Sequence, residues 1–198
     1  MADDWLAFTP ALELAQLIRS KELSPVELVS FLLERIADLN PKLNAYLTVA
    51  EIEAMSAARE AEAAALRGGE LPPLHGIPLS VKDLHFTRGL RTTGGSLAFK
   101  DFVPDDDCVA VERLRLAGAI ILGKTNTPEF GLSATTENRL GGDCRNPWHL
   151  ERTTGGSSGG AAAAVASGLG PLALGSGYHL VFDARQYHRI TNHCRRVN

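Results

Sequence analysis

Gly155-Gly156-Ser157-Ser158-Gly159-Gly160 stands directly before the small apolar run Ala161-Ala162-Ala163-Ala164-Val165-Ala166, and this stretch decides the fold. Four glycines around two hydroxyls allow tight turns and backbone conformations that other residues rarely adopt. A helix that starts from this loop would point its free N–H groups and the positive end of its dipole into the loop. A flexible Gly/Ser linker or an ordinary helix start explains the spacing about equally well, although linkers seldom run straight into an apolar helix. A phosphate-binding P-loop fits poorly, because no Gly-Lys-Ser/Thr closes the motif.

Outside this loop, helical and strand-like segments alternate along the chain. Five segments predict helices from apolar spacing, capping residues or small-residue composition: 10–18, 24–39, 49–66, 109–116 and 161–167. Three short apolar runs bounded by Gly or Pro predict strands: 76–81, 119–122 and 171–174. Ser24 is the expected cap of the second helix, and Asn40-Pro41 is expected to end it. The alternation favours the α/β class.

Lys82 closes the predicted strand 76–81 and is followed by Asp83. A lysine at the end of an apolar strand can be partly buried, and desolvation would lower its pKa toward the range of a general base. The alternative, a solvent-exposed lysine paired with Asp83, is the more common arrangement for an isolated lysine. Lys82 by itself is therefore a weak functional signal.

The composition argues against several classes of protein. The 198 residues are 44% hydrophobic and 22% charged, which is typical of a globular chain and not of a disordered or coiled-coil one. A net charge of −3 gives no bulk attraction to nucleic acid or to an anionic membrane, and no apolar run approaches the ~20 residues that span a bilayer. Residues 1–5 are acidic and do not begin a secretory signal. Three widely spaced cysteines support neither a disulfide framework nor a zinc site, so we expect a reducing, cytoplasmic location.

Several motifs accompany Lys82 and the Gly/Ser loop in a fixed order within residues 5–176: Gly76-Ile77-Pro78-Leu79-Ser80-Val81-Lys82-Asp83, Thr92-Thr93, Ser96, Gly123-Lys124-Thr125-Asn126, Glu129-Phe130, Arg145-Asn146-Pro147-Trp148 and the loop itself. In this combination the chain resembles the amidase signature family, which includes general amidases, fatty-acid amide hydrolases and the A-type component of the tRNA-dependent amidotransferase. The resemblance implies a mixed central sheet flanked by helices. It also implies hydrolysis of a carboxamide C–N bond, with a small-molecule amide as substrate and neither a cofactor nor a metal.

The resemblance further implies roles for individual residues. Lys82 matches the family's base, and Ser157 matches the serine that follows a cis peptide bond and relays a proton. A neutral lysine can accept the proton of Ser157, which in turn activates the nucleophile. Gly155, Gly156 and Ser158 are expected to contact the substrate, and Ser158 either supports the site through hydrogen bonds or simply caps the helix that follows.

The family's nucleophilic serine lies 24 residues after the relay serine, and this chain has Val181 at that position. Valine has no hydroxyl, thiol or amine, and His179 and Leu180 replace the glycines expected to form the oxyanion hole. The loss of one oxyanion donor typically costs about 10²–10³ in rate. Ser176 lies five positions before Val181, and because an extended chain spans up to about 3.5 Å per residue, we expect Ser176 to lie too far away to substitute. The sequence therefore predicts that the nucleophile is lost and the chain inactive.

The charge pattern changes at the same place. Residues 1–176 hold 16 Lys/Arg and 22 Asp/Glu, a net of −6, whereas residues 177–198 hold four Arg and one Asp, a net of +3. We therefore expect an incomplete amidase domain over 1–176 and an unrelated tail over 177–198, with a frameshift or recombination as the hypothesis for its origin. His188 and His193 are five apart, unlike the i,i+4 spacing of a helical ligand pair, so no metal site is predicted in the tail.

These observations leave three functions open. The first is an amidase by ancestry that has no activity as this chain. The second is a non-catalytic remnant or an interaction protein. The third is the N-terminal half of a split amidase or of an amidotransferase A-type subunit, with a partner chain that completes the fold.

Overall fold

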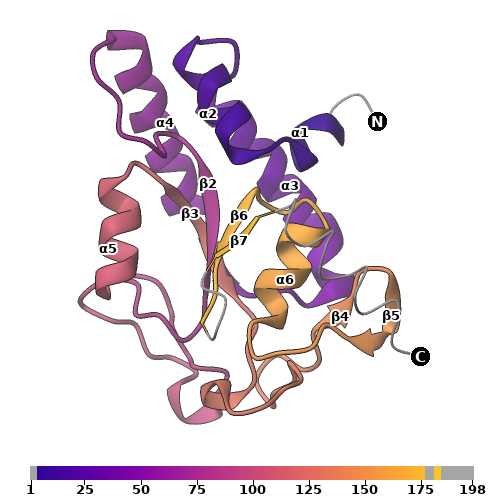
Figure 1. Ribbon diagram of the computed structural model, residues 1–198. Coiled ribbons are helices and arrows are strands. Elements are labelled where there is room, and N and C mark those ends of the chain that lie inside the picture. The colour runs from indigo at the N-terminus through magenta and orange to yellow at the C-terminus, as the bar shows by residue number, and fades with distance from the viewer. Residues whose placement is uncertain (1–3, 177–180, 184–198) are drawn as a thin grey trace.

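The computed structural model describes residues 4–176 and 181–183, and its centre is a five-stranded mixed sheet (Figure 1). The strand order is β1 (Tyr46–Val49), β3 (Ile120–Thr125), β2 (Pro78–Lys82), β6 (Leu172–Leu174) and β7 (Val181–Asp183). The three inner strands are parallel, whereas β1 and β7 run antiparallel to their neighbours at the two edges. The predicted α/β class with a mixed central sheet is confirmed.

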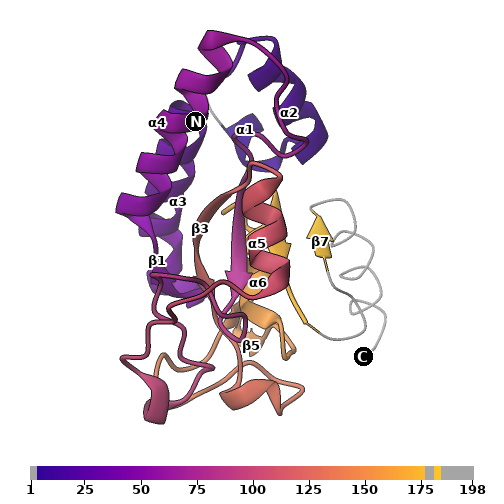
Figure 2. The ribbon, with the colours of Figure 1, turned by 90° about the vertical axis from the view of Figure 1, so that its left-hand side faces the viewer.

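Helices cover both faces of this sheet. They are α1 (Asp4–Phe8), α2 (Ala11–Arg19), α3 (Pro25–Leu43), α4 (Glu51–Arg67), α5 (Val109–Leu116) and α6 (Gly159–Ala166). In Figure 2, α3 and α4 stand along one face and α5 along the other. The main apolar core lies under α2, α3 and α4 and includes Ile120 and Leu122 of β3. Leu79 and Ile121, whose side chains point the other way, pack with Val111 of α5.

The long connections hold the remaining elements. These are two 3-10 helices, Leu97–Phe99 and Glu129–Gly131, and a two-stranded sheet of β4 (Arg145–Asn146) with β5 (His149–Thr153). Within the residues that the structure describes, no helix combines the length and apolar character needed to cross a membrane.

The second predicted helix is present as α3, but its predicted end is wrong. Ser24 caps α3 as expected, because its hydroxyl accepts a hydrogen bond from a backbone N–H of the first turn at 3.1 Å. The helix does not stop at Asn40-Pro41 and continues to Leu43. The helix continues past the proline because Leu43 packs in the main apolar core, and it ends where Asn44 adopts the left-handed conformation.

The sequence pattern did not reveal β1, β4 or β5. A helix is predicted from about residue 49, but α4 begins at Glu51, and the four residues Tyr46–Val49 pair with β3. The remaining predicted helices and strands are present with ends shifted by at most three residues. β1 carries little local signal because its partner β3 is distant in the sequence. β4 and β5 pair with each other across a short turn, but β4 has only two residues and every residue of β5 is exposed, so neither strand shows an apolar pattern.

A bulge in β3 places Lys82 and Lys124 on opposite faces of the sheet. β3 holds one extra residue relative to β2 between Ile121 and Gly123. Beyond the bulge, Lys124 lies opposite Val81, and the residue after it lies opposite Lys82. Because successive side chains of a strand alternate between the faces of a sheet, Lys82 and Lys124 point to opposite faces.

Candidate active site

Lys82, the last residue of β2, contacts two serine hydroxyls. The lysine is fully buried, and its Nζ donates hydrogen bonds to Oγ of Ser157 at 2.7 Å and to Oγ of Ser176 at 2.8 Å. β2 and β6 are parallel neighbours, so their carboxyl ends meet at the same edge of the sheet. Ser176 follows the end of β6 and therefore reaches the lysine.

Ser157 comes from the Gly/Ser loop before α6, and the peptide bond between Gly156 and Ser157 is cis, as the resemblance predicts. Thr136 holds this loop in place. Its hydroxyl donates to the carbonyl oxygen of Gly155 at 2.7 Å and accepts from the backbone N–H of Gly159 at 3.1 Å. Thr136 lies outside every motif quoted above, so no sequence signal pointed to it.

Close packing explains the glycines of this loop. A Cβ atom at Gly160 would lie 2.3 Å from the backbone nitrogen of Asn126 and 2.6 Å from the carbonyl oxygen of Ala45. A Cβ atom at Gly156 would lie 2.9 Å from the backbone of Thr135. The stretch is therefore a packed element that fixes α6 against the end of β3, and the flexible-linker alternative is wrong.

Ser158 binds Ser176 and does not cap α6. Its hydroxyl donates to the carbonyl oxygen of Ser176 at 3.0 Å and accepts from the backbone N–H of the same residue at 3.2 Å. Its side chain makes no capping hydrogen bond with the helix. Ser158 thus fixes the backbone of the second serine on Lys82, while contact of Gly155, Gly156 and Ser158 with substrate stays a prediction.

Ser176 is the functional candidate that sequence reasoning set aside. Counting residues back from Val181 shows how far Ser176 lies from the predicted nucleophile position. The distance between Ser176 and Lys82 depends instead on the parallel pairing of β2 with β6. His85 adds a contact beside Ser176, since its Nε2 lies 3.3 Å from the carbonyl oxygen of Gly175. The signal that could have found Ser176 is its place two residues after the predicted strand 171–174.

Val181, the predicted position of the lost nucleophile, is the first residue of β7, where its backbone pairs with Leu174 of β6. His179, Leu180 and most of the predicted tail lie outside the described residues. The domain boundary predicted at residue 176 and the origin of the tail therefore stay hypotheses.

Burial controls the protonation of Lys82. Desolvation lowers the pKa of this amine from the ordinary 10.5 to about 8. At pH 7 roughly a tenth of the amine is then neutral, and the neutral form is the one that accepts a proton from a hydroxyl. The geometry and the lowered pKa together make Lys82 a candidate base for either serine.

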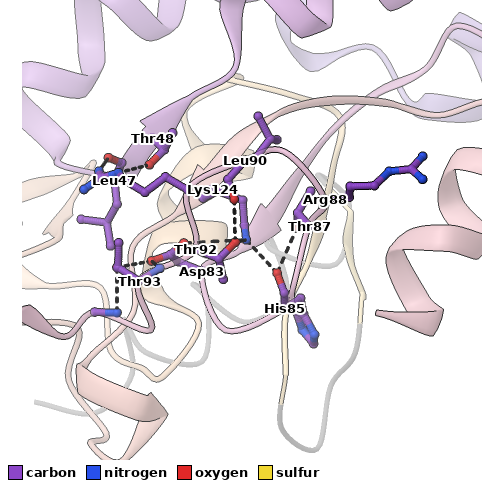
Figure 3. A network of polar contacts seen from close by, with 12 residues as sticks. Leu47, Thr48, Asp83, His85, Thr87, Arg88, Leu90, Thr92, Thr93 and Lys124 are labelled. Carbon is purple, nitrogen blue, oxygen red and sulfur yellow. Dashed lines mark hydrogen bonds and ion pairs between the residues drawn. The ribbon is translucent and has the colours of Figure 1, made fainter. Parts of the chain in front are cut away.

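On the other face of the sheet, Lys124 and Asp83 form a second buried group (Figure 3). Nζ of Lys124 lies 3.7 Å from Oδ1 of Asp83 and donates to the carbonyl oxygen of His85 at 2.7 Å and to Oγ1 of Thr92 at 2.6 Å. Oδ2 of Asp83 accepts from the hydroxyl of Thr93 and from its backbone N–H, the latter at 2.9 Å. Burial lowers the pKa of Lys124 to about 8 and raises the pKa of Asp83, and the attraction between the two charges opposes both shifts.

This second group holds the segment that follows Lys82. Asp83 and His85 come directly after the lysine, and His85 contacts both the amine of Lys124 and the carbonyl oxygen of Gly175. Oδ1 of Asp83 is buried without a hydrogen-bond donor, so the ammonium group of Lys124 compensates its charge. The network therefore ties β3 to the backbone that carries the candidate base.

Two further features bear on possible ligands. In the described part of the chain, no three His, Cys, Asp or Glu side chains gather closely enough to hold a metal ion. An apolar pocket of about 250 Å³ borders the buried network, and its lining includes Leu84 and the phenylalanines Phe86, Phe99, Phe102 and Phe130. The chemistry that the described residues offer at Lys82 is that of an amine and two hydroxyls.

Comparisons with known proteins agree on one family. The Amidase family model matches residues 27–177. The A-type subunit of the glutamyl-tRNA(Gln) amidotransferase of Acidothermus cellulolyticus is 46% identical over 166 residues, which cover 84% of this chain and 33% of that protein. The structure of a bacterial aryl acylamidase of the amidase signature family aligns with a TM-score of 0.80 at 36% identity, over 84% of this chain and 35% of that one. Fatty acid amide hydrolase aligns with a TM-score of 0.82 at 28% identity, over 86% of this chain and 30% of that one.

The matched region covers the parallel strands, the Gly/Ser loop and Lys82. The chain spans about a third of the length of the curated relatives it matches. On the family model, the relatives and the shared fold, the chain belongs to the amidase signature family.

Proposed function

We propose that this chain holds the proton-transfer residues of an amide-hydrolysing active site, with Lys82 as the base and Ser157 as the relay. The observation that carries the proposal is the 2.7 Å hydrogen bond between Nζ of the buried Lys82 and Oγ of Ser157. The relatives support the reaction class, because they are named an amidotransferase, an acylamidase and an amide hydrolase. The proposed substrates are small carboxamides.

In this proposal, protons move along a short chain of groups. The proton of an attacking hydroxyl passes to Ser157 while Ser157 passes its own proton to neutral Lys82. The protonated lysine later returns a proton through Ser157 to the departing amine nitrogen. The first transfer requires Lys82 to start neutral, which its burial favours.

Val181 occupies the position proposed for the nucleophile. A hydrocarbon side chain has no proton to release and cannot form an acyl ester. Removal of the nucleophile from a site whose residues act as a unit abolishes nearly all covalent catalysis. We therefore propose that this chain by itself does not turn over carboxamides.

A partner chain that supplies the nucleophile is the alternative. One observation favours it, since the relative from Acidothermus cellulolyticus is named as a subunit of an amidotransferase. Such a partner would bring a hydroxyl within hydrogen-bond distance of Ser157. A cytoplasmic location forms part of the proposal, because Cys108 and Cys144 are free thiols.

An ammonia-release assay tests this proposal. The wild-type chain, Lys82→Met and Ser157→Ala are each incubated with acetamide, propionamide and benzamide, and circular dichroism verifies that all three are folded. We expect all three proteins to release ammonia no faster than the buffer blank, because the valine at position 181 has no hydroxyl to attack the amide. Release from the wild-type chain that disappears in both variants would show that the chain is a working amidase.

A further inference from the structure

A second hydroxyl lies on the candidate base. Oγ of Ser176 is 2.8 Å from Nζ of Lys82, almost as close as Oγ of Ser157 at 2.7 Å. Lys82 itself is fully buried, whereas both serines are only partly buried. One buried amine therefore serves two serines that are each more exposed than the lysine.

We propose that Ser176 is an acyl acceptor in this chain, activated by Lys82 and able to take the acyl group of an activated ester. The inference rests on the proposed function in one respect, the role of Lys82 as a base. It goes beyond that function because it assigns a nucleophile that belongs to the described residues and is not at position 181.

The surroundings of Ser176 fix its orientation. Ser158 binds both polar backbone groups of Ser176, at 3.0 and 3.2 Å. His85 contacts the carbonyl oxygen of the preceding Gly175 at 3.3 Å. A nucleophile within hydrogen-bond distance of its base is the arrangement that nucleophilic catalysis needs, and here the backbone of the nucleophile is held as well. These contacts do not use the Ser176 hydroxyl, which is left to Lys82.

The neighbours of Ser157 distinguish the two serines. A Cβ atom added to Gly131 would lie 3.6 Å from Oγ of Ser157 and 2.8 Å from a methyl group of Leu84. Gly131 thus lies beside the Ser157 hydroxyl, which also contacts Lys82. The position of this hydroxyl suits a proton relay between groups, and Ser176 at the end of β6 is left as the attacking group.

The proposed step balances with p-nitrophenyl acetate. Oγ of Ser176 attacks the carbonyl carbon, and its proton passes to neutral Lys82. The bond from that carbon to the phenolic oxygen breaks, and its electron pair leaves with p-nitrophenolate. The products are acetyl-Ser176, protonated Lys82 and p-nitrophenolate. The phenolate departs without needing a proton, unlike the amine of a carboxamide, so this step is compatible with the absence of amide turnover.

The test is a burst measurement with peptide mapping on the full chain. We expect about one p-nitrophenolate per chain in the burst, with the acetyl group on Ser176. Replacement of the base by Lys82→Met should slow the burst about 100-fold. Removal of the acceptor by Ser176→Ala should abolish the burst, whereas Ser176→Cys should keep it. The exposed Ser133 provides the matched control, and Ser133→Ala should leave the burst unchanged. The burst rate should rise with pH and level off above the Lys82 pKa of about 8, because the neutral amine is the active form.

The outcomes separate the two proposals. An acetyl group on Ser157, an unchanged burst in Ser176→Ala, or no burst above the buffer rate overturns the assignment of Ser176. If the label is on Ser157 and Lys82→Met abolishes it, Lys82 keeps its role as base while Ser176 loses the role of acceptor. A burst on Ser176 that persists in Lys82→Met contradicts activation by Lys82 and with it both proposals.

Discussion

Lys124→Met is expected to lower the free energy of unfolding by about 3–5 kcal/mol, the cost of breaking a buried ion pair by removing one partner. Asp83 stays buried in this variant, and its Oδ1 has no hydrogen-bond donor to replace the ammonium group. The carbonyl oxygen of His85 and the hydroxyl of Thr92 also lose the amine. Urea denaturation at pH 7 measures the change.

Two variants control this experiment. Lys100→Met removes a lysine of the same size from an ion pair whose side chains are 58% and 80% exposed, and it should change stability by less than about 1 kcal/mol. The double variant Asp83→Asn with Lys124→Met removes both charges. Its free energy of unfolding should fall by less than the sum of the decreases in the two single variants. Equal stabilities of Lys124→Met and Lys100→Met would show that the buried pair does not hold this segment.

Gly160→Ala is expected to destabilise the fold by about 3 kcal/mol through overpacking. The added methyl group would meet the backbone of Asn126 and Ala45 at distances of 2.3 to 2.6 Å, and backbone atoms cannot move aside as a flexible side chain does. The substitution would also disturb the hydrogen bond from the N–H of Gly160 to the carbonyl oxygen of Asn126. Thermal unfolding followed by circular dichroism measures the loss.

The same loop supplies the control for this prediction. Gly155→Ala places its methyl group in open space, and its cost of about 1 kcal/mol comes from a φ of +75° alone. If Gly160→Ala costs no more than Gly155→Ala, α6 does not pack on the end of β3 as the structure shows.

The inner strands and most helices could be predicted because their signals are local. The runs that became β2, β3 and β6 are apolar and bounded by Gly or Pro, and Ser24 marks the start of α3. The strand Tyr46–Val49 depends on pairing with β3, which lies more than 70 residues away in the chain. Pro41 misled the prediction of the end of α3 because the burial of Leu43 in the core, which the local pattern does not show, carries the helix past the proline.

The candidate site was predictable only in part. The motifs led to Lys82 and Ser157 through a family resemblance, and the structure brings the two together at 2.7 Å. The contact between Lys82 and Ser176 depends on the parallel alignment of β2 with β6, which no local pattern specifies. Lys124 stands in a quoted motif, but its burial opposite Val81 depends on the bulge in β3.

Titration of the Lys82 side chain tests the central claim, that a partly neutral amine serves two hydroxyls. The full chain is prepared with ¹⁵N-labelled lysine, and the Lys82 and Lys124 signals are assigned by their loss in Lys82→Met and in Lys124→Met. We predict that Nζ of Lys82 titrates with a pKa of about 8. Titration of Lys82 at the ordinary lysine value of about 10.5 would contradict the account, because the amine would then be almost fully protonated at neutral pH and unable to act as a base.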